Sequence, residues 1–325
     1  MALAEYFGMQ HAVLIGSATD GLTLAIHKLC ADRNGAILTC GHGFVAQIMA
    51  SHRIQKPVIL VDCTLETGQI DTNHVEACLR KNDIACLYVA SLHGIAAPLT
   101  DLRRLADQYG IPMIEDFAQS AGASCEKGLV GTYGNLSVTS IYPTKPLAGI
   151  ATGGAILTNH TDHADWCRRG RFFGLDAGYA NEPLVHARMS ELSAGAALRG
   201  LSYFETLRYE REQLFKRYQQ HLDTTFHGPR ALPQDGSAYH HYIIYVKNRD
   251  NIRKQLQQKS IGTGTYFPVT LLEHQMSLGH IETFEEIPNC YFHAKHNLAL
   301  PLWEGLTEAQ IDYICETVLK IAEPA

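Results

Sequence analysis

Short apolar runs alternate with helical patterns through the first two-thirds of the chain. The apolar runs cover residues 12–15, 36–39, 57–62, 84–90 and 111–114, with another from Leu136, and the helical patterns cover residues 20–30, 74–81, 100–109 and a stretch from about Phe44. Strands joined by helices lie parallel to one another. The alternation therefore predicts an α/β fold with a mostly parallel sheet between layers of helices.

The pattern changes after about residue 190. Residues 190–222 predict one long helical stretch that bends or splits near Gly200, and the prolines and glycines of residues 228–236 predict a boundary loop. Beyond the loop we expect a strand over residues 239–247 and helices over residues 250–259 and 307–321, the last with Thr307 as its N-cap. These patterns predict a large domain over residues 1–225 and a small C-terminal α/β domain over residues 226–325.

Composition and charge exclude several classes of protein. Hydrophobic residues make up 46% of the 325 residues and charged residues 18%, so the chain can form a core and is not disordered throughout. The formal net charge of −6 argues against a nucleic-acid partner, which requires a basic face. The sequence shows no run as long as a membrane span and no signal-peptide pattern, so we expect a cytoplasmic protein with no membrane contact.

Cysteine and histidine usage predicts no metal site. The nine cysteines are scattered without a CxxC pair, which favours reduced thiols over a disulfide framework or a zinc knuckle. His240 and His241 lie in a predicted strand, where adjacent side chains face opposite ways, so they are not expected to share a metal. The basic cluster of Arg168, Arg169 and Arg171 indicates either a solvated helix end or contact with a phosphorylated ligand.

Three polar segments follow predicted strands, at the edge of a parallel sheet where ligands bind. The first, at residues 16–21, reads Gly-Ser-Ala-Thr-Asp-Gly. Small residues and a helix N-terminus suit a phosphate group, to which Thr19 can add its hydroxyl. A tight turn in which Thr19 or Asp20 is an ordinary N-cap would explain the same residues.

The other two segments contain Asp116 and Lys145. Asp116 ends an apolar strand, where its carboxylate can keep a ring nitrogen protonated or simply cap the next turn. A strand from Leu136 leads to Lys145, in a loop that continues to the glycines at 153–154. Most single lysines are unreactive surface groups, and a reactive one needs a pKa lowered by burial or by neighbouring cations.

Residues 41–46 allow a different interpretation. They read Gly-His-Gly-Phe-Val-Ala, which matches the GxGxxA fingerprint of dinucleotide sites, and Asp62 ends the next strand, where a ribose-binding acid is expected. This pattern predicts an NAD-dependent oxidoreductase. It gives no role to Asp116 or Lys145.

Taken together, the chain resembles the DegT/DnrJ/StrS-type family of sugar aminotransferases, which are fold-type I enzymes that use pyridoxal 5'-phosphate (PLP). The resemblance runs from about Ala4 to the C-terminal helix. It rests on motifs at residues 17–22 (Ser-Ala-Thr-Asp-Gly-Leu), 44–46 (Phe-Val-Ala), 115–119 (Glu-Asp-Phe-Ala-Gln), 140–145 (Ser140 to Thr144-Lys145), 188–192 (Arg-Met-Ser-Glu-Leu), and 300–308 (Leu-Pro-Leu, then Gly-Leu-Thr-Glu).

The resemblance implies a role for each site residue. Lys145 would bond covalently to the cofactor, Asp116 would pair with the ring nitrogen, and Gln119 would lie near the ring hydroxyl. Phe44 would stack on the ring, and Ala18, Thr19 and Ser140 would hold the phosphate. His186 stands where the family usually has an asparagine that reaches the partner's cofactor phosphate, and the candidates for substrate contact are Arg188, His93 and Tyr142.

The resemblance also implies an activity. We expect a homodimer with shared active sites that moves an amino group from an amino acid, glutamate by expectation, to a nucleotide-linked keto-sugar. Some relatives replace the lysine with histidine and are dehydratases, and Lys145 argues against that branch. A keto-cyclitol or keto-acid sugar is an alternative acceptor. A PLP-binding regulatory protein that no longer transaminates and the NAD-dependent oxidoreductase are alternatives of other classes.

Overall fold

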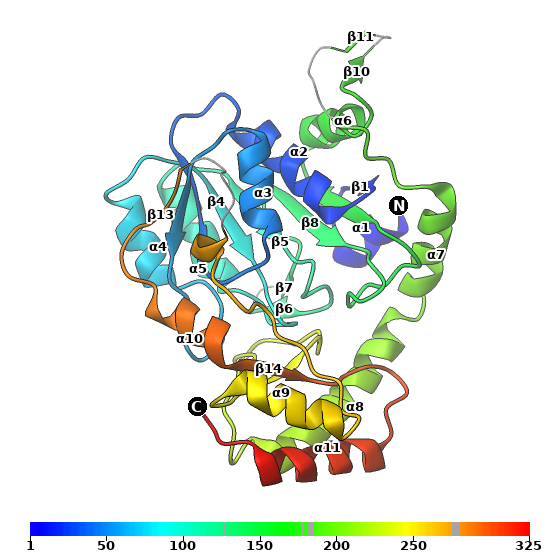
Figure 1. Ribbon diagram of the computed structural model, residues 1–325. Coiled ribbons are helices and arrows are strands. Elements are labelled where there is room, and N and C mark those ends of the chain that lie inside the picture. Colours follow the sequence, from blue (N-terminus) through cyan, green and yellow to red (C-terminus); the bar gives the residue numbers. More distant parts are fainter. Residues whose placement is uncertain (127, 177–178, 181–184, 275–279) are drawn as a thin grey trace.

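The centre of the molecule is an eight-stranded sheet with the order β1-β9-β8-β5-β4-β2-β3-β13 (Figure 1). The computed structural model describes residues 1–126, 128–176, 179–180, 185–274 and 280–325. The strands of the sheet are β1 (His11–Ile15), β2 (Ala36–Cys40), β3 (Val58–Val61), β4 (Ile84–Ala90), β5 (Met113–Asp116), β8 (Leu136–Ser140), β9 (Gly154–Thr158) and β13 (Ile281–Thr283). All pairs from β8 to β13 are parallel, whereas β9 runs antiparallel to both of its neighbours. The predicted mostly parallel sheet is confirmed.

Helices cover both faces of this sheet. The helices of this part are α1 (Ala2–Phe7), α2 (Ala18–Cys30), α3 (Ala46–Arg53), α4 (Thr72–Leu79), α5 (Leu99–Gln108) and α6 (Thr161–Gly170). β4 is buried along its whole length, and its alternate residues enter separate cores. Leu87 and Val89 pack in the core that includes residues of α1, α4 and α5, whereas Tyr88 packs in the core that includes residues of α2, α3 and α6. This is the predicted arrangement of a sheet between two layers of helices.

The long helical stretch after residue 190 is split into two helices. These are α7 (Glu191–Leu201) and α8 (Phe204–Leu222). A Cβ at Gly200 would lie 2.9 Å from the Ala148 carbonyl oxygen, so this glycine permits close packing at the end of α7. The split near Gly200, one of the two predicted possibilities, is the one observed.

A second core lies at the other end of the molecule, at the bottom of Figure 1. It contains residues of α8, β12 (Tyr242–Tyr245), α9 (Arg249–Gln258), β14 (Asn297–Leu300) and α11 (Glu308–Ile321). Thr307 is the N-cap of α11, and its side chain and that of Gln310 form a capping box, which confirms the predicted cap. The remaining described elements are β6 (Ser124–Cys125), β7 (Gly128–Leu129), β10 (Leu175–Asp176), β11 (Tyr179–Ala180), the 3₁₀ turn η1 (Leu271–Glu273) and α10 (Pro288–His296).

We propose a domain boundary near residue 225, as the sequence predicts. Two elements cross such a boundary. The end of α8 contributes Phe215 and Leu222 to the small core, and β13 returns from the C-terminal part to pair with β3 in the large sheet. The two parts are therefore joined by packing as well as by the chain.

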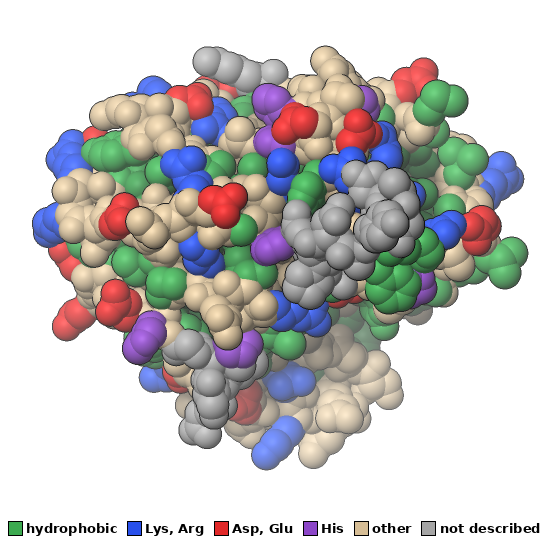
Figure 2. Space-filling view, turned by 90° about the horizontal axis from the view of Figure 1, so that it is seen from above, with side chains coloured by type: hydrophobic (Ala, Val, Ile, Leu, Met, Phe, Trp, Pro, Cys, Tyr) green, Lys and Arg blue, Asp and Glu red, His purple; other side chains and the backbone are tan. Residues whose placement is uncertain are grey.

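Charged side chains of both signs are interspersed over the face of the molecule shown in Figure 2. Among the described residues, no helix combines the length and the apolar character that crossing a bilayer would require.

Glu115 ties β5 to the segment that precedes β8. Its buried carboxylate accepts hydrogen bonds from the N–H groups of Gly131, Tyr133 (2.9 Å) and Gly134 (3.1 Å) and from the Ser137 hydroxyl (3.0 Å). Burial raises the pKa of Glu115, and these hydrogen bonds act in the opposite direction. The residue beside Asp116 in the chain is thus a structural anchor.

We expect Glu115→Ala to lower the free energy of unfolding by about 3 kcal/mol or more, because several buried donors lose their acceptor. Urea unfolding followed by fluorescence measures this. The matched control is Glu316→Ala, whose side chain is 69% exposed, and this change should cost less than about 0.5 kcal/mol. Equal costs for the two variants would show that the hydrogen bonds of Glu115 contribute nothing to stability.

Candidate active site

A pocket of about 380 Å³ opens where the parallel strands end. The site residues predicted from the sequence that line it are Ala18, Thr19, Phe44, Asp116, Gln119, Ser140, Tyr142 and Lys145. Asp116 ends β5 and Ser140 ends β8, so adjacent parallel strands deliver both side chains to the same edge of the sheet. The pocket has the size of a site for a small organic ligand.

The N-terminus of α2 forms one wall of the pocket. Ser17 is the N-cap: its hydroxyl accepts a hydrogen bond from the Asp20 N–H (3.1 Å) and donates one to the Asp20 carboxylate (2.8 Å). The alternative in which Thr19 or Asp20 is an ordinary N-cap is therefore wrong. The geometry of a helix start leaves the N–H groups of Ala18 and Thr19 without an acceptor in a preceding turn. Arg53 pairs with the Asp20 carboxylate at 2.8 Å and offsets its negative charge at this anion-binding end.

Gly154 allows β9 to approach α2 closely. A Cβ at this position would lie 2.9 Å from the Ala18 nitrogen and 2.8 Å from the Thr139 carbonyl oxygen, which no real side chain could occupy. Gly154 is thus required by close backbone packing beside the helix N-terminus, whereas a Cβ at Gly153 would meet the side chain of Met189. The sequence shows the two glycines, but it does not show which backbone atoms Gly154 contacts.

Asp116 is held by hydrogen bonds to both carboxylate oxygens. Tyr88 donates its hydroxyl hydrogen to Oδ2 (2.8 Å), and the Ala118 N–H donates to Oδ1 (3.0 Å). Burial raises the pKa of Asp116, while these two hydrogen bonds and the nearby charge of Lys145 act to lower it. A cationic N–H group placed beside this carboxylate would offset the cost of burying its charge. Sequence reasoning missed Tyr88, since a tyrosine within an apolar strand gives no signal of this role.

Lys145 lies in the loop after β8, with its backbone N–H bonded to the Tyr142 carbonyl oxygen at 2.9 Å. Burial lowers the pKa of Lys145, and the charge of Asp116 raises it only in part, so its pKa lies below the ordinary value. The amine is therefore more often neutral than that of a surface lysine, which is the form that attacks a carbonyl carbon. The sequence alone could not establish this property.

Gln119 lines the pocket, whereas His93 does not. The Gln119 Oε1 atom accepts a hydrogen bond from the His93 N–H at 2.9 Å. The His93 ring is buried between the rings of His42 (centroids 5.7 Å apart) and His241 (5.8 Å). The backbone of His93 thus contacts the pocket residue Gln119, while its ring lies among the rings of His42 and His241.

His240 and His241 do not lie in a strand. They precede β12, and their ring centroids are 3.7 Å apart, so the prediction that they face opposite ways is wrong. The alternation of a strand does not apply to them because the ladder with β14 starts only at Tyr242.

His186 and Arg188 lie outside the pocket lining of this chain. His186 is exposed and stacks on Phe173, with centroids 4.9 Å apart. Arg188 is half exposed, lies over the Phe172 ring and is 3.5 Å from the Glu191 carboxylate. Their suggested contacts with cofactor or substrate remain predictions. In the basic cluster, Arg168 pairs with Asp165 of its own helix, an arrangement typical of a solvated helix end.

The dinucleotide interpretation is not supported by the position of Asp62. Its carboxylate accepts hydrogen bonds from the N–H groups of Asn289 (3.1 Å) and Cys290 (2.8 Å) at the start of α10. This acid therefore caps a helix. Phe44, from the same GxGxxA pattern, is 52% exposed and lines the pocket that contains Lys145.

The pocket residues fit PLP. The helix start and Gly154 form a close-packed backbone cradle suited to a phosphate. Asp116 suits a protonated ring nitrogen, and Lys145 has the lowered pKa that a bond to an aldehyde requires. Each end of the cofactor thus has a chemically matched partner in the same pocket.

The rate at which Lys145 captures PLP should rise with pH through a midpoint below the ordinary 10.5, because burial favours the neutral amine. Brief exposure of the PLP-free protein to PLP at each pH, followed by borohydride and mass spectrometry, measures the captured fraction. In Asp116→Asn the midpoint should move lower still, because the charge of Asp116 raises the pKa of Lys145. A midpoint at or above 10.5, or an upward move in the variant, would contradict this account.

Known proteins share this sequence pattern and fold. A model of the DegT/DnrJ/EryC1/StrS aminotransferase family matches residues 1–319. A dTDP-3-amino-3,4,6-trideoxy-alpha-D-glucose transaminase of Micromonospora megalomicea subsp. nigra is 28% identical over 98% of this chain and 87% of that protein. A pleiotropic regulatory protein of Geobacillus stearothermophilus is also 28% identical, over 99% of this chain and 87% of its own length.

The fold is also that of solved aminotransferases. The crystal structure of a family member from Brucella abortus has a TM-score of 0.92 at 24% identity and covers 98% of this chain and 87% of that one. S. venezuelae DesV has a TM-score of 0.90, also at 24% identity, with 98% and 86% covered. The predicted fold-type I architecture is confirmed by these likenesses. With its motifs matched from residue 1 to residue 319, the chain belongs to the DegT/DnrJ/EryC1/StrS aminotransferase family.

Proposed function

We propose that this chain is a PLP-dependent aminotransferase that moves an amino group from an amino acid, with glutamate as the expected donor, to the keto group of a nucleotide-linked sugar. The observation that carries the proposal is the single pocket shared by Lys145 and Asp116. The names of two relatives support the acceptor class: the transaminase of Micromonospora and a UDP-2-acetamido-2-deoxy-3-oxo-D-glucuronate aminotransferase of Pseudomonas aeruginosa, 27% identical over 96% of this chain.

The pocket offers a set of residues to hold the cofactor. The first turn of α2, with Ser140, would hold its phosphate; Phe44 would cover one face of the ring, and Gln119 would lie near the ring hydroxyl. Asp116 would keep a proton on the ring nitrogen, because its buried carboxylate requires a positive partner. PLP, when bound, supplies an electron-withdrawing ring that stabilises the negative charge left on a donor carbon after proton loss.

Lys145 would move the protons. Its amine, whose pKa is lowered by burial, takes the proton from the α-carbon of the amino donor. In the second half of the reaction the protonated amine returns a proton to the sugar carbon that becomes aminated. Tyr142 lies in the same loop and lines the pocket, which supports its candidate role as a substrate contact.

The proposal includes a homodimer with shared active sites. His186 and Arg188 are exposed and lie outside the pocket of their own chain. This position is compatible with a role in the pocket of a partner subunit, where His186 would donate to the cofactor phosphate and Arg188 would bind the donor's carboxylate.

A non-transaminating regulatory protein is the second candidate. Two relatives favour it by name: the pleiotropic regulatory protein of Geobacillus stearothermophilus and an erythromycin biosynthesis sensory transduction protein of Saccharopolyspora erythraea, 28% identical over 97% of this chain. Such a protein would bind PLP and react with no amino donor. The pocket would still contain Lys145 and Asp116, so chemistry must separate the two candidates.

A spectral screen tests the proposed reaction. Glutamate should convert the cofactor to its amine form with loss of the visible band, and a panel of keto-sugars, free and nucleotide-linked, should then be tested for return of that band. Return with a nucleotide-linked keto-sugar is expected. No reaction with any amino donor would favour the regulatory candidate, and return only with a keto-cyclitol or keto-acid sugar would redefine the acceptor.

The covalent link should map to one residue. Borohydride reduction of the PLP-loaded protein followed by a peptide map should place the cofactor on Lys145, and Lys145→Ala should lose turnover while it still binds free PLP weakly. Lys56→Ala is a control, because the Lys56 amine is bonded to the Arg33 carbonyl oxygen on an exposed surface. A label on any other lysine would overturn the assignment.

Asp116→Asn should reduce turnover by about 100-fold or more with the fold intact, because an amide cannot balance a protonated ring nitrogen. Tyr88→Phe removes one hydrogen bond to Asp116 and keeps its charge, so this variant should lose much less activity. Turnover and circular dichroism measured on both proteins check this order. Near-normal turnover of Asp116→Asn would remove its proposed role.

A further inference from the structure

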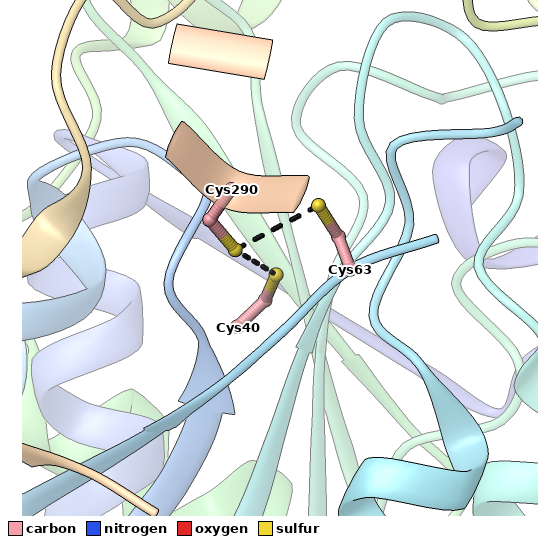
Figure 3. A group of neighbouring side chains, drawn as sticks. All are labelled: Cys40, Cys63 and Cys290. Atoms are coloured by element: carbon pink, nitrogen blue, oxygen red, sulfur yellow. Dashed lines mark hydrogen bonds between the residues drawn. The ribbon is translucent and has the colours of Figure 1, made fainter. Parts of the chain in front are cut away.

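Three cysteines that are far apart in the sequence meet in the core of the large domain. Cys40 ends β2, Cys63 follows β3, and Cys290 lies in the first turn of α10 (Figure 3). The Cys290 Sγ atom is 4.0 Å from the Cys40 Sγ atom and 3.7 Å from the Cys63 Sγ atom, and all three sulfurs lie within 4.8 Å of one another. None of these side chains is more than 5% exposed. Figure 3 shows the sulfur atoms turned toward a common centre.

The spacing of the sulfur atoms suits a metal ion. A metal–sulfur bond of about 2.3 Å separates the sulfurs by about 3.8 Å in a tetrahedral site and about 4.0 Å in a trigonal one. The two sulfur–sulfur distances of 3.7 and 4.0 Å fall close to these values. Packed thiols also touch at such distances, so the charge and shape of the surroundings must decide between the two.

The surroundings favour a cation. The buried carboxylate of Asp62 accepts a hydrogen bond from the Cys290 N–H at 2.8 Å, beside the sulfur atoms. The His42 N–H donates to the Cys40 sulfur at 3.4 Å. A carboxylate buried beside three sulfur atoms favours a positive charge at this place.

The backbone is shaped closely around the sulfurs. A Cβ at Gly41 would lie 3.3 Å from the Cys290 sulfur and 2.8 Å from a methyl group of Ile287, so the missing side chain leaves room for this contact. Of the nine cysteines, all buried, only these three are part of such a group of possible metal ligands within the described ranges. The convergence of cysteines from three separate elements is therefore specific to this place in the described part of the chain.

We propose that Cys40, Cys63 and Cys290 form a binding site for one thiophilic metal ion, zinc(II) or copper(I), held by three thiolates. Sulfur ligands select such ions over magnesium or calcium. Each cysteine that binds the ion releases its thiol proton, and the ion's charge offsets part of the negative charge of the three thiolates and Asp62. The bound ion ties α10 to the ends of β2 and β3, next to the segment that leads to Phe44 in the active-site pocket. The site is separate from that pocket and is independent of the proposed reaction.

The direct test uses the full-length wild-type protein with its cofactor. The metal content per chain is measured by elemental mass spectrometry after purification without added metal and after stripping with a chelator under reducing conditions. The stripped protein is then titrated with zinc(II) and, separately, with copper(I) in competition with a chelator of known affinity. About one ion per chain is expected, and the ion found in the protein as purified identifies the native metal. Cobalt(II) should give thiolate charge-transfer absorption.

Variants locate the bound ion. Cys63→Ser and Cys290→Ser should lose binding of one ion per chain, whereas Cys167→Ser should retain it, because Cys167 is equally buried in α6 and lies outside the cluster. PLP absorbance measured on the same samples reports independently on the proposed function. Absence of bound metal and of the cobalt–thiolate band in folded, fully reduced wild-type protein would overturn the site, and so would unchanged binding in both cluster variants.

Discussion

The active-site pocket depends on the burial of two groups that water would keep charged. In low-dielectric surroundings each charge is disfavoured, so the pKa of Asp116 rises and that of Lys145 falls. The amine thereby becomes able to bond to a carbonyl carbon, and the acid becomes a group that is stabilised by a cation. Each change is useful only if a ligand supplies both an electrophilic carbon and a basic ring nitrogen. The electrostatics of the pocket thus match the ligand proposed for it.

The sheet makes this arrangement rigid. Glu115 and Asp116 are adjacent at the end of β5, and their side chains point to opposite faces. Glu115 fixes the segment before β8 through buried hydrogen bonds, while Asp116 lines the pocket with Tyr88 of β4 behind it. Glu115 therefore holds β5 and β8 together at the place where Asp116 lines the pocket. The two neighbouring carboxylates differ in role because Glu115 accepts four hydrogen bonds away from the pocket, whereas Asp116 accepts two and lines the pocket.

Local signals explain what the sequence could predict. The strands of the parallel sheet and the cap at Thr307 follow from periodicity and from side-chain chemistry within a few residues. The start of α2 was misplaced because Ser17, Thr19 and Asp20 can all cap a helix. In the structure the Ser17 hydroxyl accepts the hydrogen bond from the Asp20 N–H, so Ser17 is the cap. β13 was not predicted because it has only three residues, and its pairing with β3 depends on the return of the chain from the small core.

The cysteine cluster was beyond sequence reasoning for the same physical reason, since residues 40, 63 and 290 meet only through the fold. A search for CxxC pairs tests only the spacing of cysteines along the sequence. A site assembled from two strands and a helix has no such short spacing. The structure also explains the dinucleotide-like pattern beside Cys40. A Cβ at Gly41 would crowd Ile287 and the Cys290 sulfur, and one at Gly43 would overlap the side chain of Gln47, which bonds to Thr39. Both glycines are therefore needed for packing. The short segment they belong to joins Cys40 of the sulfur cluster to Phe44 at the wall of the pocket, so its shape is set by packing and not by a dinucleotide.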